Sequence, residues 1–282
     1  MAQKSLVTGA TGNIGREVVR QLKEKGADFV AGSSRGSVEG VESVSINFDD
    51  KASLVSAMQD ISTLFMLLPS HPDMVKWGEN IIDTAKECGV SHVVRSSGSL
   101  ADKGSPIMVE ELLGTTDAYV RNSGLDFTIT APSFFMQNFI NYFSEDYKNG
   151  AIFQPAGNET IGWVDVRDIA AVNALVLLNP DKYKGRSLTI TGSEGLSYSG
   201  AVEQMNQVLG KQAQYIAVPD EAAIDAMKGL GFPEFVINMM MSLNHSIRQG
   251  HAKEVTDTTQ QVLGRPPIAF KHFVEDHKSA WL

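Results

Sequence analysis

The apolar run Ser5-Leu6-Val7-Thr8 is followed directly by Gly9-Ala10-Thr11-Gly12-Asn13-Ile14-Gly15. Glycine tolerates the positive φ of a tight turn, and its missing Cβ lets backbone amides approach an anion. A helix that starts at such a turn adds unpaired N–H groups and the positive end of its dipole. A strand, a glycine-rich turn and a helix in this order are typical of a site for the pyrophosphate of a dinucleotide. The spacing here is G-x-x-G-x-x-G rather than G-x-G-x-x-G, so the neighbouring sequence has to support the assignment.

The residues after the turn give that support. Arg16 to Lys25 is predicted to be an amphipathic helix with Val18, Val19 and Leu22 facing inward, and Gly26 ends it. Ala27 to Gly32 is then predicted to be a second strand. A complete βαβ unit therefore fits within about 30 residues, as the dinucleotide-binding pattern requires.

The composition excludes several classes of protein. The chain has 282 residues, of which 43% are hydrophobic and 20% charged, and this is enough to bury a full globular core. A net charge of −9 with no basic stripe argues against direct nucleic-acid binding. We expect no secretory signal and no membrane span, because no basic segment precedes an apolar one and no apolar run approaches 18 residues.

Cysteine and histidine usage adds two expectations. Cys88 is the single cysteine, so an internal disulfide is excluded and a cytoplasmic location is expected. The histidines show no metal-binding spacing, and we predict no metal site.

Alternating strands and helices predict the rest of the fold. Further strands are expected at Ser43 to Phe48, Ser62 to Leu68, His92 to Arg95, Asp126 to Ala131 and Ser187 to Thr191. Helices are expected between them at Lys51 to Gln59, Asp73 to Glu87 and Ile107 to Asn122. This succession predicts an α/β fold with a doubly wound parallel sheet of the Rossmann type.

The second half of the chain has a different pattern. Helices are predicted at Ser199 to Leu209, Asp220 to Leu230, Glu234 to Arg248 and Phe270 to Ala280, with a short strand at Gln214 to Val218. We therefore expect residues 1–132 to form the NADP-binding core. Residues 133–282 are expected to form a mixed region, with further core elements at about 160–192 and a smaller, mainly helical substrate lobe.

The residues after the second predicted strand indicate which dinucleotide is bound. An NAD site usually has an acidic residue there, whereas a 2′-phosphate needs a positive partner. This chain has Ser33-Ser34-Arg35, in which Arg35 lies 20 residues after Gly15 and Ser34 adds a hydrogen-bond donor. NADP(H) is therefore preferred over NAD(H). Asp49 is predicted to accept a hydrogen bond from the adenine amino group, the alternative being that it caps the following helix.

Several further motifs belong together. They are Asp49 with Ser53-Leu54-Val55-Ser56-Ala57-Met58, Pro132-Ser133-Phe134-Phe135-Met136-Gln137-Asn138-Phe139, Trp163-Val164-Asp165-Val166-Arg167-Asp168-Ile169-Ala170 and Leu263-Gly264-Arg265-Pro266-Pro267. With the glycine-rich turn they resemble the NmrA-like branch of the atypical short-chain dehydrogenases/reductases, which includes NADPH-sensing regulators, quinone reductases and triphenylmethane dye reductases. The resemblance implies that the cofactor is surrounded by Gly9, Thr11, Gly12, Asn13, Ile14, Gly15, Arg35, Leu68, Pro69, Ser97, Pro132, Ser133, Phe134 and Phe135.

The chain departs from the wider superfamily in its acid residues. The usual acid is the tyrosine of Y-x-x-x-K, and none of the six tyrosines here has a lysine four residues later. No lysine lies between Lys103 and Lys148. Two hypotheses remain open. The chain either reduces a quinone, a cationic dye or another electron-poor conjugated acceptor, or binds NADP(H) without turnover as a redox sensor that signals to a protein partner. A homodimer is compatible with the sequence, which carries no specific signal for one.

Candidate acceptor-binding and catalytic residues lie near the ends of predicted strands. Phe135, Met136 and Phe139 would supply an apolar, adaptable surface for a flat acceptor. Phe135 and Phe139 lie four residues apart and are expected on one helix face. The alternative is that these side chains form part of the hydrophobic core, as such residues usually do. His71 follows the fourth strand and titrates in a useful range, and Ser97 ends the fifth. Both are candidate catalytic residues. Asp165 and Asp168 are interpreted as residues that cap a helix.

Overall fold

The computed structural model describes residues 4–282, which divide into two compact units. Unit 1 comprises residues 4–104, 111–131 and 166–189, and unit 2 comprises residues 105–110, 132–165 and 190–282. The chain therefore passes between the units several times. We describe each unit by itself.

Unit 1 is built on a sheet with the order β3-β2-β1-β4-β5-β6-β8. The strands are β1 (Ser5–Val7), β2 (Phe29–Ser33), β3 (Ser43–Ser45), β4 (Thr63–Leu67), β5 (His92–Ser96), β6 (Asp126–Pro132) and β8 (Arg186–Ile190). The neighbouring pairs from β3 to β6 are parallel. The strand order reverses between β1 and β4, so the doubly wound fold expected from the sequence is confirmed.

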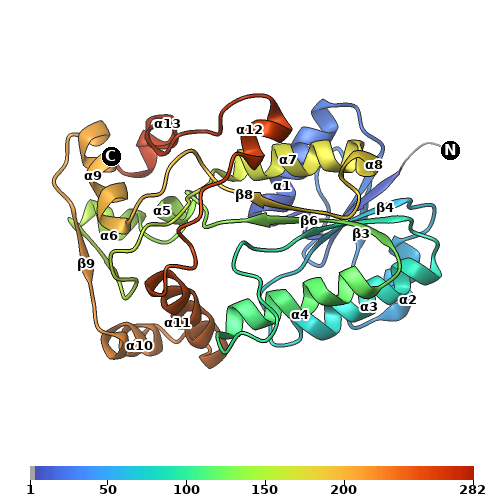
Figure 1. Cartoon of the computed structure of the whole chain (residues 1–282), viewed down its shortest axis with the longest axis horizontal. Helices are drawn as coiled ribbons and strands as arrows, with labels where there is room; N and C mark the ends of the chain where they lie inside the picture. Colours follow the sequence, from blue (N-terminus) through green and yellow to red (C-terminus); the bar gives the residue numbers. More distant parts are fainter. Residues whose placement is uncertain (1–3) are drawn as a thin grey trace. The chain divides into compact units, whose positions relative to one another are not determined.

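Helices cover both faces of this sheet. In Figure 1, α1 (Asn13–Glu24) and α7 (Val166–Leu178) lie on one face, and α2 (Lys51–Ala57), α3 (Met74–Glu87) and α4 (Met108–Asn122) lie on the other. The helix α8 (Pro180–Tyr183) follows α7. Because both faces are covered, the central strands are buried, and every residue of β1, β2 and β5 is buried, including the polar side chains of β5.

Unit 2 is mainly helical. Its helices are α5 (Asn138–Asn141), α6 (Ser144–Lys148), α9 (Tyr198–Leu209), α10 (Asp220–Gly229), α11 (Glu234–Arg248), α12 (Thr258–Leu263), α13 (Phe270–Asp276) and a 3₁₀ turn at Lys278–Ala280. β7 (Ala151–Gln154) pairs in parallel with β9 (Gln214–Ala217). Its core is aromatic, with Trp163, Phe139, Phe270 and Tyr198 packed edge to face or tilted against one another.

The structure corrects several sequence-based boundaries. α1 begins at Asn13 rather than Arg16, so Gly15 lies in its first turn. The strand predicted to reach Phe48 ends at Ser45, and the closing helix breaks after Asp276 into the 3₁₀ turn. β7 was not predicted, because its four residues pair with a strand about sixty residues away.

Phe135 and Phe139 do not share a helix face, so that expectation was wrong. α5 begins only at Asn138. Phe135 instead forms a parallel bridge with Val164, in which the Val164 amide donates to Phe134 O at 2.8 Å and the Met136 amide donates to Val164 O at 2.9 Å. These bonds hold the residues after Pro132 in an extended conformation.

Candidate functional site

The turn between β1 and α1 is closed by glycines for steric reasons. Gly9 has a φ of +67°, and the Gly12 amide donates to its carbonyl oxygen at 2.9 Å. A Cβ at Gly15 would lie 2.1 Å from the Gly9 carbonyl oxygen, closer than any real contact. Any larger residue at Gly15 would therefore push the helix away from the turn.

The start of α1 is left open for an anion. Gly12 is its N-cap and has no side chain to accept from the first amides, and the first turn holds no acidic residue. Backbone N–H groups at such a helix start, together with the helix dipole, bind phosphate well. Thr11, Asn13 and Ile14 form the rim of this cradle, with Asn13 exposed and Ile14 buried. The geometry fits a dinucleotide pyrophosphate.

The end of β2 is tied to this turn. Ser33 Oγ lies 3.0 Å from Thr11 Oγ1 and accepts from the Arg35 amide at 3.0 Å. The Ala10 amide donates to Gly32 O at 3.1 Å. The side chains of Ser34 and Arg35 are exposed, and within residues 4–282 the Arg35 guanidinium has no ion pair or hydrogen bond. It is therefore available to an anionic ligand.

Asp49 does not cap the following helix. Asp50 is the N-cap of α2, and its side chain accepts from the Ala52 amide at 2.9 Å. The two oxygens of Asp49 accept from Lys76 Nζ at 2.7 Å and from Trp77 Nε1 at 2.9 Å. These hydrogen bonds, Lys76 first, lower the pKa of Asp49. Its predicted contact with adenine stays a prediction.

His71 lies beside the same tryptophan. Its ring stacks on Trp77 with a centroid distance of 4.2 Å and an interplanar angle of 16°. The Asp73 amide donates to His71 Nδ1 at 3.1 Å, so the neutral ring carries its proton on Nε2 and is a donor there.

Two residues of the predicted cofactor-binding set follow β4. Leu68 is buried, whereas Pro69 is exposed.

Ser97 is part of a buried polar network that the sequence analysis missed. Its Oγ donates to Asp117 Oδ2 at 2.7 Å, and Arg95 Nε donates to Asp117 Oδ1 at 3.3 Å. Arg95 is 1% exposed. An arginine in the centre of a buried strand needs an anionic partner, and this was the signal that could have led to Asp117. Burial raises the pKa of Asp117, while Arg95 and Ser97 oppose that effect.

The described tyrosines do not replace the missing acid. Tyr119 donates to Asp83 Oδ1 at 2.8 Å, and this hydrogen bond raises its pKa to about 12. Burial raises the pKa of Tyr147 to about 12 and also raises that of Tyr198. A useful acid near neutral pH needs the opposite shift.

The segment after β6 lies in unit 2, and its side chains are largely buried. Pro132 and Ser133 are buried, and Ser133 Oγ has no hydrogen-bond partner within residues 4–282. Phe134 and Phe135 are partly buried, and Phe134 packs edge to face on Trp163. Met136 is 1% and Phe139 0% exposed, so both are core side chains of unit 2 with no free surface for an acceptor.

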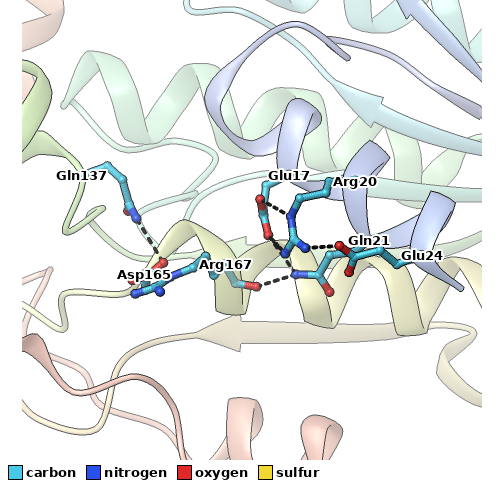
Figure 2. Close-up of polar contacts among 7 residues, drawn as sticks. All are labelled: Glu17, Arg20, Gln21, Glu24, Gln137, Asp165 and Arg167. Atoms are coloured by element: carbon cyan, nitrogen blue, oxygen red, sulfur yellow. Dashed lines mark hydrogen bonds and ion pairs between the residues drawn. The ribbon is translucent and has the colours of Figure 1, made fainter. Parts of the chain in front are cut away.

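The residues around the start of α7 make internal contacts. Asp165 is fully buried and accepts from Gln137 Nε2 at 3.0 Å (Figure 2). In unit 1, Gln21 Nε2 donates to the carbonyl oxygen of Arg167 at 3.0 Å, and Arg20 pairs with Glu17 and Glu24 (Figure 2). Asp168 is also fully buried. These buried carboxylates are part of the fold.

Unit 2 contains a surface pocket of about 340 Å³. Its lining includes Ile107, Met108, Met241, Ser242, His245 and Arg248. Arg248 is bound by both oxygens of Asp220, at 2.8 and 2.9 Å. The pocket therefore combines apolar side chains with a hydroxyl, an imidazole, the Asn238 amide and the Asp220–Arg248 ion pair. Among residues 4–282 no cluster of His, Cys, Asp or Glu could hold a metal ion, and no helix is both long and apolar enough to cross a membrane.

Comparison with known proteins agrees with this geometry. The NmrA-like family matches residues 1–262. The chain belongs to the NmrA-like family. An NAD(P)H azoreductase of Xenophilus azovorans is 32% identical over 98% of each chain.

Two solved structures share the fold. One is an NADPH-dependent quinone oxidoreductase of Escherichia coli complexed with NADPH, which aligns with a TM-score of 0.87 and 21% identity over 97% of this chain and 99% of that one. The other is the triphenylmethane reductase of Citrobacter sp. complexed with NADP(H), with a TM-score of 0.85, 21% identity and the same coverage. The family resemblance expected from the sequence is confirmed.

Proposed function

We propose that this NmrA-like chain is an NADPH-dependent oxidoreductase that reduces a quinone, a cationic or azo dye, or another electron-poor conjugated acceptor. The observation that carries the proposal is the glycine cradle, in which the Gly9 carbonyl occupies the space that a Cβ at Gly15 would need and no side chain caps the first amides of α1. The azoreductase relative supports the oxidoreductase class.

The preference for NADPH rests on Arg35. Its free, exposed guanidinium follows the strand that contacts the glycine turn. A guanidinium binds a 2′-phosphate with charge-assisted hydrogen bonds. Ser33-Ser34-Arg35 contains no acidic residue, whereas NADH sites usually have one there to bind the ribose hydroxyls. When bound, the cofactor supplies the hydride.

The chain's own contribution is binding, orientation and the choice of proton donor. With no Tyr-Lys pair, and with the pKa values of Tyr119, Tyr147 and Tyr198 raised, the proposed acceptors are those that need little acid assistance. His71 presents an N–H at Nε2 that can donate a hydrogen bond to the acceptor. To act as the candidate proton donor it would have to be the imidazolium, whose Nδ1 no longer accepts from the Asp73 amide. Unit 2 is proposed to hold the acceptor, with the apolar side chains Ile107, Met108 and Met241 of its pocket against a flat conjugated molecule and its polar side chains available to orient that molecule.

The test follows NADPH absorbance with a panel of quinones, triarylmethane dyes, azo dyes and enones. We expect acceptor-dependent oxidation with at least one class and tighter binding of NADPH than of NADH by calorimetry. Tight NADPH binding without oxidation by any acceptor would instead favour the redox sensor that signals to a protein partner.

The acceptor pocket has its own test. Met241→Ala removes an apolar wall and is expected to raise the KM for the acceptor about three- to tenfold without changing the Kd for NADPH. Met240→Ala, at the neighbouring residue, which is not part of the pocket lining, is the control. Equal KM values for the two variants would place the acceptor elsewhere.

A further inference from the structure

A chain of hydrogen bonds fixes the orientation of the Ser97 hydroxyl. Arg95 is buried in β5, where Nη1 donates to Ser96 O at 2.7 Å and Nε donates to Asp117 Oδ1 at 3.3 Å. The other oxygen of Asp117 accepts from Ser97 Oγ at 2.7 Å. Each carboxylate oxygen therefore has its own donor. Asp117 itself is 6% exposed.

This arrangement makes Ser97 an acceptor toward any ligand. A serine hydroxyl has one proton and two lone pairs, and here the proton is committed to Asp117. Reversing the bond would require a protonated Asp117, which the adjacent Arg95 guanidinium opposes. Ser97 is only partly buried, so its lone pairs, which accept no hydrogen bond from residues 4–282, are accessible at the end of β5.

The sheet topology places this lone pair relative to the cofactor cradle. β4 lies between β1 and β5, so the end of β5 is about 10 Å from the end of β1. Arg35 follows β2, on the opposite side of β1. A dinucleotide with its pyrophosphate at the Gly9–Gly15 turn and its 2′-phosphate near Arg35 therefore extends its nicotinamide toward β4 and β5.

We propose that Ser97 accepts a hydrogen bond from the carboxamide N–H₂ group of the nicotinamide, and that Asp117, held by Arg95, is the positioning residue that fixes this polarity. The inference rests on the proposed cofactor binding. It also distinguishes the two candidate catalytic residues, because Ser97 offers a ligand only lone pairs whereas His71 offers an N–H donor at Nε2.

The test compares NADP⁺ with its 3-acetylpyridine analogue, which keeps the carbonyl but has a methyl group in place of N–H₂. Calorimetry measures both dissociation constants. We expect the wild-type protein to bind NADP⁺ about three- to tenfold more tightly than the analogue, the value of one hydrogen bond. In Ser97→Ala the two dissociation constants should become about equal. Ser97→Thr keeps the hydroxyl and should therefore keep the wild-type preference for NADP⁺. Ser91→Ala, at the exposed residue just before the amino end of β5, is the matched control.

Asp117→Asn tests the positioning role. Arg95 Nε would hold the amide oxygen where Oδ1 lies, so the new N–H₂ group would face Ser97 and donate to it. The Ser97 proton would then point outward, where the carbonyl oxygen of either ligand can accept it, and the preference for NADP⁺ is expected to disappear. Loss of packing alone would weaken both ligands equally. If this variant fails to fold, Ser97→Ala still decides the proposal.

The outcomes are distinguishable from failure of the proposed function. A wild-type protein that binds neither ligand overturns the proposed cofactor binding and this inference with it. Binding of both ligands with equal affinity, or a preference for NADP⁺ that survives in Ser97→Ala, overturns only the role of Ser97.

Discussion

The Gly9–Gly15 turn and the carboxyl end of β5 are proposed to recognise the dinucleotide by different means. At the turn the recognition surface is backbone, and the glycines act through the space that they leave and the amides that they expose. At the end of β5 it is one hydroxyl whose direction is set by Asp117 and Arg95. The first site is encoded in seven consecutive residues, whereas the second joins residues 20 positions apart. Local spacing can therefore predict the turn but not the polarity of Ser97.

The largest effect is expected from Gly15→Ala, which tests whether the backbone of the Gly9–Gly15 turn binds the cofactor. Its Cβ would clash with the Gly9 carbonyl oxygen, so α1 has to move away and its amides lose the pyrophosphate. We expect a roughly hundredfold weaker Kd for NADPH by calorimetry. Gly229→Ala, at the end of α10 with open space around it, is the control and should bind as the wild type does. A Gly15→Ala protein with near wild-type affinity would show that the turn is not closed by steric exclusion.

Arg35→Ala tests whether a side chain makes the Gly9–Gly15 site selective for NADPH over NADH. Removal of the guanidinium should weaken NADPH about tenfold or more and NADH less than twofold, because only NADPH carries the 2′-phosphate. Arg20→Ala is the control, since Arg20 pairs with Glu17 and Glu24 on the same helix as the cradle. Equal losses for the two cofactors would show that Arg35 does not bind the 2′-phosphate.

The smallest effect concerns His92, at the amino end of β5. Burial lowers its pKa below 6.5, and Nε2 lies 3.0 Å from Thr128 Oγ1, whose own proton goes to Tyr183 O. The unfolded chain then binds a proton that the folded chain does not. The contribution of His92 to stability is full above pH 6.5 and is lost as the pH falls below that value.

His92→Gln keeps an N–H donor but does not titrate. Urea unfolding between pH 5 and 8 should show a flatter dependence of the free energy of unfolding on pH, the difference staying below about 1.4 kcal/mol per pH unit. The exposed His272→Gln is the control. An unchanged slope in His92→Gln would show that His92 binds protons equally in the folded and unfolded chain, so that its burial does not make stability depend on pH.

The sequence predicted the parts of the molecule that depend on local pattern. The seven strands of unit 1 were expected because each is a short apolar run, and Val18, Val19 and Leu22 are buried on α1 as predicted. The pairing of Asp117 with Arg95 and Ser97 depends on how α4 packs on β5, which no local period encodes. The helix predicted to contain both Phe135 and Phe139 does not form at Phe135, because Phe135 pairs in a β-bridge with Val164, which is distant in the sequence.

The order of the segments in the chain has a consequence for synthesis. Residues 4–131 provide most of the sheet, but α7, which packs on α1, and β8 are encoded only after a long excursion into unit 2. At about 5–20 residues per second, a ribosome needs roughly 3–12 s to translate the sixty or so residues that separate the end of β6 from the end of β8. During that interval one face of the nascent sheet has α1 but lacks α7. We therefore expect the nascent chain to be a client of chaperones that bind apolar surface.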